Sequence, residues 1–498
     1  MVCHMNRPIR KILLIYPPVT YSVQSAKQSC PPLGVAYLAA AVRDITDVKV
    51  LDAAVEGYGH EERISPSLMR YGLSISEIAR RVEEFKPDAV GISCIFSSQF
   101  PTVVEIASAV KRIDPEILTL TGGTHPTFMP ERSMKMAPDL DVIVRNEGEQ
   151  TLRRIVEASQ NNGDRRSING IVYRSDGEVK VNPPVELVRD LDSLPFPARD
   201  LLPMDKYFAL DLPMGIVNRR SPWASIITSR GCPSKCSFCS STNFWGYCYR
   251  TRKPEAVLDE IEDLTDRFGV KEIKFFDDNL GAHLGRAKAI FKGIIDRGMD
   301  ITWNTPNGIG IHNLDYEIID IMKRSGCYEL TLAVESGDPY VLKNIIHKPF
   351  KLDKALEVSR ILRRMKLGTY GFFIIGFPGE TKEQILNTIK FARKLNLDRI
   401  SVFVANPLPG TEIFDISQAK GYIDEDFPFE EADYFNARFD TPEWSGKWLE
   451  KTRKKFFWNY NFSLLIRDPV RFFRVYRPVM TQRPIPILKL AISRFLAG

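Results

Sequence analysis

Three cysteines lie close together in the middle of the chain, in the segment Cys232-Pro-Ser-Lys-Cys236-Ser-Phe-Cys239. Closely spaced thiolates bind soft metal centres such as iron–sulfur clusters. Zinc and a fully ligated four-cysteine cluster need a fourth ligand, and none follows at a regular spacing; the next cysteine, Cys248, is expected to be a packed thiol. The triplet therefore predicts a soft metal centre, and in a [4Fe–4S] cluster three cysteine ligands would leave one iron open. A zinc knuckle or three unrelated buried thiols are the alternatives.

The composition sets limits on the class of protein. The 498 residues are 44% hydrophobic and 26% charged, which is typical of globular chains, and the length suits two or three domains. A formal net charge of +6 is too weak to indicate nucleic-acid binding, and eight cysteines in so long a chain do not form a disulfide framework. No apolar run could span a bilayer, and the early segment KILLIY ends in Pro17-Pro18, so we expect a strand there rather than a signal peptide. The expected location is a reducing cytoplasm.

The first 150 residues alternate β-rich runs with helical patterns, which predicts a doubly wound parallel sheet with helices on both faces. The expected strands are 11–16, 48–51, 88–93, 117–121 and 141–145, and the helical patterns cover 33–44, 74–85, 100–113 and 149–158. A hairpin on an Asp-Gly turn is expected over 170–181. The many prolines of 181–203 then indicate an interdomain linker.

A second alternating series begins near Ala224 and contains six strand–helix units, too few for a closed eight-unit barrel. We expect an open, partial barrel with strands at 224–229, 272–276, 301–305, 328–334, 370–376 and 399–405. By analogy with closed barrels, the chemistry should lie at the carboxyl ends of these strands. The cysteine triplet directly follows the first of them.

The cysteine spacing, with Phe238 as the aromatic residue before the last cysteine, resembles the CxxxCxφC signature of the radical S-adenosylmethionine (SAM) enzymes. The resemblance implies that Cys232, Cys236 and Cys239 hold a [4Fe–4S] cluster. It also implies that the open iron binds the amino and carboxylate groups of SAM. Reductive cleavage of SAM then yields a 5′-deoxyadenosyl radical.

Small or polar residues follow four later strands of the expected barrel: Phe276-Asp277-Asp278-Asn279, Val334-Glu335-Ser336-Gly337, Gly376-Phe377-Pro378-Gly379-Glu380-Thr381 and the segment 406–411. Turn chemistry alone would explain each of them, but together they match the family in register. The resemblance implies that Glu335 helps to hold SAM through its ribose, and that the turn from Gly376 to Pro378 lies beside the adenine or methionine part. Asp277 and Asp278 are expected to face the pocket, with capping of the next helix as the alternative.

The N-terminal series lacks a GxGxxG motif after its first strand, which argues against a dinucleotide site. It is similar instead to cobalamin-binding domains, whose motifs are DxHxxG, SxL and GG. Ser93-Cys94-Ile95 and Gly122-Gly123 match the last two, which implies that Ser93, Gly122 and Gly123 line the path of the cobalamin tail. The first motif is Asp52-Ala-Ala54-Val-Glu-Gly57, with Ala54 in place of the histidine that binds cobalt. Cobalamin-dependent radical SAM methylases commonly lack this histidine, and some relatives keep the domain as a scaffold only.

Two other features of this region have competing interpretations. His125 is expected to hydrogen-bond near the cobalamin tail or to pack locally rather than to bind cobalt. The segment from Arg145 to Glu149 resembles the end of the family's domain, but a loop that caps the next helix explains it equally well.

The last part of the chain, 447–498, carries twelve Lys or Arg and two acidic residues, so its charge is +10 and the other 446 residues carry −4. Ten aromatic residues are interleaved with these cations. A helical cap that closes the barrel with solvated charges is the first interpretation. Association with an anionic membrane surface is the second, and nucleic-acid binding is the least favoured because no recognition fold accompanies the charge.

The resemblance implies four parts: a cobalamin-binding-like domain at 1–180, a linker at 181–220, a radical SAM partial barrel at 221–420 and a basic, aromatic region at 421–498. We expect a cobalamin-dependent radical SAM enzyme that methylates an unactivated carbon of a small molecule, such as a lipid or a tetrapyrrole. Its partners would include a ferredoxin or flavodoxin-type reductant, and peripheral association with the inner membrane face is the alternative to a purely cytoplasmic location. The alternatives are an oxidative cyclase similar to the anaerobic magnesium-protoporphyrin monomethyl ester cyclase, and a non-catalytic cobalamin or iron–sulfur protein. No catalytic side chain is identified.

Overall fold

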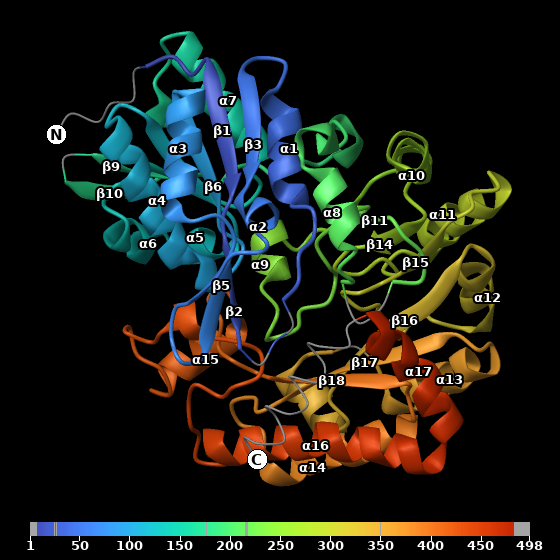
Figure 1. Cartoon of the computed structure of the whole chain (residues 1–498). Coiled ribbons are helices and arrows are strands. Elements are labelled where there is room, and N and C mark those ends of the chain that lie inside the picture. The colour runs from blue at the N-terminus through green and yellow to red at the C-terminus, as the bar shows by residue number, and fades with distance from the viewer. Residues whose placement is uncertain are drawn as a thin grey trace. The chain divides into compact units, whose positions relative to one another are not determined.

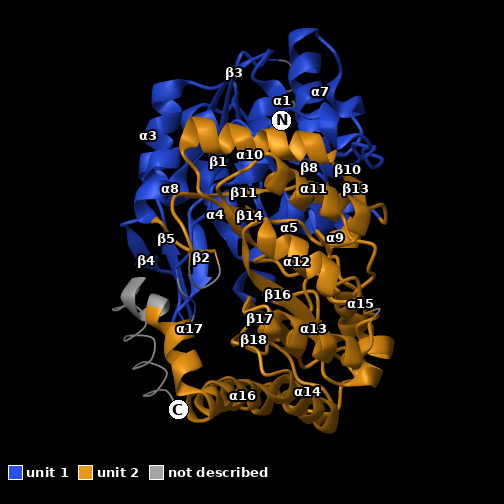
Figure 2. Ribbon diagram, turned by 90° about the vertical axis from the view of Figure 1, so that its right-hand side faces the viewer, with its two compact units in different colours: residues 1–210, 244–246, 428–432 blue, residues 211–243, 247–427, 433–498 orange. Residues whose placement is uncertain are grey.

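The computed structural model describes residues 7–23, 25, 27–175, 177–214, 218–348 and 350–482, and the chain forms two compact units (Figure 1). Unit 1 comprises 1–210, 244–246 and 428–432, and unit 2 comprises 211–243, 247–427 and 433–498 (Figure 2). The segment expected as a linker, 181–220, is divided between the two units at residue 210.

Unit 1 is built on a seven-stranded sheet in the order β10-β9-β8-β7-β6-β1-β3. The strands β1, β3, β6, β7 and β8 are parallel, and β9 and β10 form the expected antiparallel hairpin; Asp176 of its turn lies outside the described residues. The strand bounds are β1 (Lys11–Tyr16), β3 (Asp47–Asp52), β6 (Ala89–Ser93), β7 (Leu118–Gly122), β8 (Val142–Val144), β9 (Ile171–Ser175) and β10 (Glu178–Val181). The prediction of a doubly wound sheet is confirmed.

Helices cover both faces of this sheet because the strand side chains are apolar on both sides. On one face, α3 (Ile75–Phe85) and α4 (Phe100–Ile113) pack on Leu13, Val90 and Ile92. On the other, α1 (Leu33–Val42) and α7 (Glu149–Gln160) pack on Ile12, Leu14 and Leu120. The short helices are α2 (Ala53–Glu56), α5 (Thr124–Phe128), α6 (Pro130–Met136) and α8 (Met204–Leu210).

A small antiparallel sheet that the sequence pattern did not predict also belongs to unit 1. Its order is β2-β5-β4, with β2 (Val19–Ser22), β4 (Glu61–Arg63) and β5 (Leu68–Tyr71). These strands have only three or four residues, which is too short for the alternation of apolar and polar positions to be recognised.

Unit 2 is an open barrel of six parallel strands in strict chain order, β11-β14-β15-β16-β17-β18. The strands are β11 (Trp223–Ile226), β14 (Glu272–Phe275), β15 (Thr302–Asn304), β16 (Cys327–Glu335), β17 (Gly368–Ile375) and β18 (Arg399–Val404). The helices that connect or follow them are α10 (Pro254–Phe268), α11 (Leu284–Asp296), α12 (Tyr316–Arg324), α13 (Leu352–Arg364), α14 (Lys382–Leu395) and α15 (Glu412–Ala419). The predicted partial barrel is confirmed.

Two helices follow the barrel, α16 (Gly446–Arg467) and α17 (Pro469–Gln482). The buried side of α16 packs on the last strands: the Phe456 ring lies 5.9 Å from that of Phe373, and the Tyr460 hydroxyl donates to the Leu397 carbonyl at 2.8 Å. Residues 483–498 of the basic region lie outside the described residues. Among the helices that are described, none has the length and apolarity needed to cross a bilayer.

Candidate active site

The cysteine triplet lies in the loop after the first barrel strand, as the sequence predicted. A two-stranded antiparallel ribbon, β12 (Ser229–Arg230) with β13 (Arg250–Thr251), closes the base of this loop, and α9 (Ser241–Trp245) lies within it. The buried guanidinium of Arg286 donates to the carbonyl of Thr228 at 2.6 Å and to that of Arg252 at 2.7 Å. One side chain of α11 therefore holds both ends of the ribbon.

The polar residues after β14 fix the loop from the other side. Asp277 is 2% exposed and accepts hydrogen bonds from the Thr228 amide at 3.2 Å, the Thr228 hydroxyl at 2.6 Å and the Ser229 hydroxyl. Asp278 accepts from the Ser241 hydroxyl at 2.6 Å. Burial raises the pKa of both carboxyls, and the neighbouring Asp277 also raises that of Asp278. In this structure both side chains hold the cysteine loop in place.

The three cysteines of the triplet are free thiols close enough to influence one another. Cys248 is exposed, so the expectation that it is a packed thiol is wrong. Burial raises the pKa of Cys236 to about 11, with a further contribution from Cys232; burial raises that of Cys239 to about 12, with contributions from Asp278 and the other two thiols. The side-chain amide of Asn279 lies 3.8 Å from the Cys232 sulfur. Without a bound metal, Cys236 and Cys239 are therefore protonated at neutral pH, so a metal centre must displace their protons.

The backbone between the cysteines is anchored to two later elements of the barrel. The Ser237 amide donates to the Ile346 carbonyl at 3.1 Å, and the Ser237 carbonyl accepts from the Ile413 amide at 3.0 Å. The Phe238 ring lies 6.0 Å from that of Phe377, in an apolar cluster that also includes Val341. The aromatic residue of the signature thus packs the loop onto the turn after β17.

A buried ion pair lies beside the thiols. Glu335 ends β16 with a left-handed backbone (φ 65°), and Lys348 donates from Nζ to its Oε1 at 2.8 Å. The two side chains are 7% and 11% exposed. Burial would lower the pKa of Lys348, but Glu335 and, when ionised, Cys236 and Cys232 raise it overall. A strained, buried residue with a charged partner is typical of functional sites.

The turn after β17 is held by a second buried carboxyl, Glu380. Its Oε2 accepts from the amides of Gly376 at 2.7 Å and Phe377 at 3.1 Å, and burial raises its pKa to about 8. Gly376 has a φ of 86°, and a Cβ atom there would lie 2.2 Å from Leu449. Only glycine fits this position, so the turn that includes Pro378 has a fixed backbone.

The residues present fit an iron–sulfur cluster better than a single metal ion. Among the described residues, no three His, Cys, Asp or Glu side chains are close enough to surround one ion. A cluster differs because each thiolate binds its own iron, so the sulfurs need not converge on one point. Three neighbouring free thiols with a buried lysine beside them suit an anionic cluster and a carboxylate-bearing ligand.

In unit 1 the predicted cobalamin residues lie together at the carboxyl edge of the sheet. Ser93 and Gly122 are paired at the ends of β6 and β7. Gly123 has a φ of 121°, and a Cβ there would lie 2.3 Å from the Cys94 carbonyl oxygen. Gly123 therefore lies against the backbone after β6, and a larger residue would not fit there.

The structure shows the surroundings of Asp52 and Ala54, the two residues at the start of the altered DxHxxG motif. Ala54 is buried, and Asp52 caps α2 by accepting from the Val55 amide at 3.2 Å and also accepts from the Tyr207 hydroxyl. Burial raises the pKa of Asp52 to about 7. Tyr207 therefore binds the aspartate of a motif in which alanine replaces the histidine.

His125 lies at the same edge as a neutral side chain. Its Nδ1 is 2.9 Å from the Ser97 hydroxyl, and burial, with a contribution from Arg132, lowers its pKa to about 4. Its Nε2 is buried with no hydrogen-bond partner among the described residues.

Sequence reasoning missed Lys348, Glu380 and Tyr207 as functional candidates. Glu380 belongs to the segment 376–381 that the sequence analysis singled out. Its position four residues after Gly376 was the signal that could have identified it as an acceptor for the backbone of this turn. Lys348 follows the π-helical turn Val341–Ile345 and Tyr207 lies in α8, and no local sequence pattern marks either residue.

Comparisons with known proteins agree with this geometry. The B12 binding domain model matches residues 20–156, and the Radical SAM superfamily model matches residues 226–392. The chain is 35% identical to an uncharacterized methyltransferase of Pyrococcus horikoshii, over 83% of this chain and 84% of that protein. It is 31% identical to the cytidylyl-2-hydroxyethylphosphonate methyltransferase of Streptomyces wedmorensis, over 92% and 91%. The fold is similar to that of OxsB, a cobalamin-dependent S-adenosylmethionine radical enzyme solved with aqua-cobalamin bound, with a TM-score of 0.69 at 19% identity over 98% of this chain and 73% of that one.

Proposed function

The chain belongs to the cobalamin-dependent radical SAM enzymes, and on that premise we propose that it transfers a methyl group to an unactivated carbon of a small molecule. A lipid-like molecule is the substrate class that the basic, aromatic C-terminal region favours. The single observation that carries the proposal is the set of three free thiols in one loop beside the buried Glu335–Lys348 pair, at the carboxyl ends of the barrel strands. A non-catalytic carrier would not need that pair.

Each part of the site has a separate task. When bound, the cluster with SAM supplies a 5′-deoxyadenosyl radical, and cobalamin supplies the methyl group. Cys232, Cys236 and Cys239 are the cluster ligands, and Asp277 and Asp278 hold the loop that presents them.

SAM carries one carboxylate, one ammonium group and a ribose with two hydroxyls. Lys348 offers a buried cation for the carboxylate, and Glu335 offers an acceptor for the ribose hydroxyls. The Gly376–Pro378 turn, fixed by Glu380, leaves exposed backbone for the adenine or methionine part. These contacts orient a reactive ligand and keep water away from it, which a radical reaction requires.

In unit 1, Ser93, Gly122 and Gly123 line the path of the cobalamin tail. Ala54 cannot bind cobalt, so this chain contributes no imidazole at that motif position. The aspartate of the same motif, Asp52, accepts a hydrogen bond from the Tyr207 hydroxyl. A ferredoxin or flavodoxin-type protein is the proposed electron donor. The proposed location is the cytoplasm.

Anaerobic reconstitution of the full chain with iron, sulfide, reductant, cobalamin and SAM tests this function. The wild type should form both 5′-deoxyadenosine and S-adenosylhomocysteine. Cys236→Ala should form no 5′-deoxyadenosine, whereas Cys248→Ala, which removes an exposed cysteine outside the triplet, should behave as the wild type. Formation of 5′-deoxyadenosine without S-adenosylhomocysteine would reject methyl transfer in favour of a cyclase-type reaction. Failure to form either product would reject both methyl transfer and the cyclase-type reaction.

A further inference from the structure

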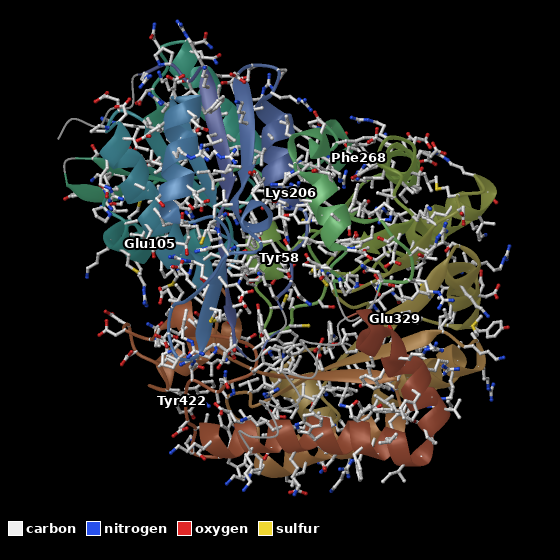
Figure 3. The ribbon with its side chains drawn as sticks, viewed as in Figure 1. Tyr58, Glu105, Lys206, Phe268, Glu329 and Tyr422 are labelled. Carbon is white, nitrogen blue, oxygen red and sulfur yellow. The ribbon has the colours of Figure 1, made fainter. Side chains whose placement is uncertain are left out.

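The helix α16 presents large apolar side chains on the side that does not pack on the barrel. Trp458, Phe462 and Ile466 are 46%, 64% and 66% exposed. They recur at intervals of four residues, so they form one row along the helix. Val470 and Phe473, at the start of α17, are 78% and 54% exposed. We call Trp458, Phe462 and Ile466 the apolar row; Figure 3 draws the side chains of both helices.

The apolar row is not used to hold the helix on unit 2. That contact is made by the other side of α16, where Leu449, Phe456, Tyr460 and Leu464 are each no more than 1% exposed. The helix is therefore apolar on two sides, one buried and one open. A contiguous exposed apolar strip on a folded protein usually marks an interaction surface.

Cations accompany the row. Lys454 precedes Trp458 by one helical turn on the same row, and Lys447, Lys451 and Lys455 form the adjacent row, also with a spacing of four. All four lysines are exposed, and none of them has an ion-pair partner among the described residues. The described stretch from 447 to 477 has two carboxylates. Glu450 is half-buried and accepts from the Ala437 amide at 3.1 Å, and Asp468 is exposed and accepts from the Arg471 amide at 2.9 Å.

We propose that the apolar row and these lysines bind the surface of an anionic membrane. The apolar tips enter the boundary between headgroups and acyl chains, and the lysines extend to the phosphates. The argument for lipid is charge complementarity. An apolar strip beside uncompensated cations matches a surface that is apolar below and negative above, whereas a second copy of the same face would bring lysines against lysines. This inference goes beyond the methyl transfer and does not depend on it.

Vesicle flotation of the full chain tests the proposal. Vesicles of phosphatidylcholine with 30% phosphatidylglycerol should carry the protein upward in about 0.1 M salt, and pure phosphatidylcholine should carry much less. Each surface cation contributes about a fivefold increase in partitioning, so Lys451→Ala/Lys454→Ala/Lys455→Ala should weaken binding about a hundredfold. Phe462→Ser/Ile466→Ser should weaken it at least tenfold.

Matched variants elsewhere on unit 2 control for general charge and apolarity. Lys292→Ala/Lys323→Ala removes exposed lysines from α11 and α12, and Tyr316→Ser removes a tyrosine that is 62% exposed; both should bind as the wild type. Circular dichroism and thermal unfolding of each variant keep a folding defect apart from a binding defect. Because flotation needs neither cluster nor SAM, failure of the methyl-transfer proposal leaves its outcome unchanged.

Three results would overturn the proposal. The first is a wild-type protein that stays at the bottom with anionic vesicles, and the second is equal loss of binding in the control variants. The third is a dimer in sedimentation analysis that Phe462→Ser/Ile466→Ser converts to monomer without any vesicle binding, which would assign the row to a second copy.

Discussion

Replacing Lys348 by methionine leaves the Glu335 carboxylate buried without its cation. The two side chains are 11% and 7% exposed and their charged atoms are 2.8 Å apart. Removing one member of such a buried pair costs about 3–5 kcal/mol, because the remaining charge loses its partner without regaining water. Glu335→Gln should cost a similar amount. The double variant removes both charges and should cost only about 1 kcal/mol, so the two single effects should be strongly non-additive.

Urea unfolding of the reduced protein without cofactors measures these differences. Five of the six tryptophans, at 223, 303, 444, 448 and 458, belong to unit 2, so their fluorescence reports mainly on the barrel. Lys348→Arg, which keeps a cation, serves as the control and should retain most of the stability. If the two single effects add, or if Lys348→Met lowers the free energy of unfolding by less than about 1 kcal/mol, the buried Glu335–Lys348 ion pair is refuted.

The same substitution should change thiol chemistry. Burial raises the pKa of Cys236 to about 11, and Lys348 opposes that rise. Without the lysine the pKa rises further, so less thiolate is present at any pH below it. Alkylation of Cys236 by iodoacetamide at pH 9 should therefore be slower in Lys348→Met than in Lys348→Arg, as read by peptide mass spectrometry.

Three further predictions concern the supports of the site. Asp277→Ala leaves the donors of Thr228 and Ser229 without their acceptor, which should cost about 2–4 kcal/mol in urea unfolding and lower the iron bound per chain after reconstitution. The pKa of Glu380, about 8, lies above its ordinary value, so the folded state binds a proton more tightly than the unfolded state. The free energy of unfolding should therefore fall as pH rises from about 4 to about 8. Glu380→Gln should flatten this part of the thermal-unfolding profile, and an unchanged slope would reject the raised pKa of Glu380. Gly376→Ala combines a φ of 86° with a 2.2 Å clash, whereas Gly379→Ala has a φ of 85° and open space, so the first should cost about 1–3 kcal/mol more than the second in urea unfolding.

The larger framework was predictable because it repeats. Six strands, each followed by a helical pattern, predict an open barrel. Glu335 ends a strand, Gly376 directly follows one and the cysteines lie in the loop after the first, so the parallel strands bring them to one edge. Ser93 and Gly122 became neighbours for the same reason, since they end adjacent strands.

Other features depend on contacts that leave no periodic trace. Lys348 pairs with Glu335 across a single π-helical turn, Val341–Ile345, that lies between them in the sequence. Tyr207 meets Asp52 across 155 positions of sequence. The α16 pattern mixes two apolar sides, so sequence alone could not separate the residues that pack on the barrel from those that remain exposed.

The central claim is that Cys232, Cys236 and Cys239 hold a cluster with an open iron that binds SAM. Electron paramagnetic resonance of the reconstituted, dithionite-reduced protein tests it most directly. We expect the signal of a reduced [4Fe–4S] cluster that changes shape when SAM is added, is absent in Cys236→Ala and is retained in Cys248→Ala. A signal that SAM leaves unchanged, or one that survives loss of Cys236, would contradict the account.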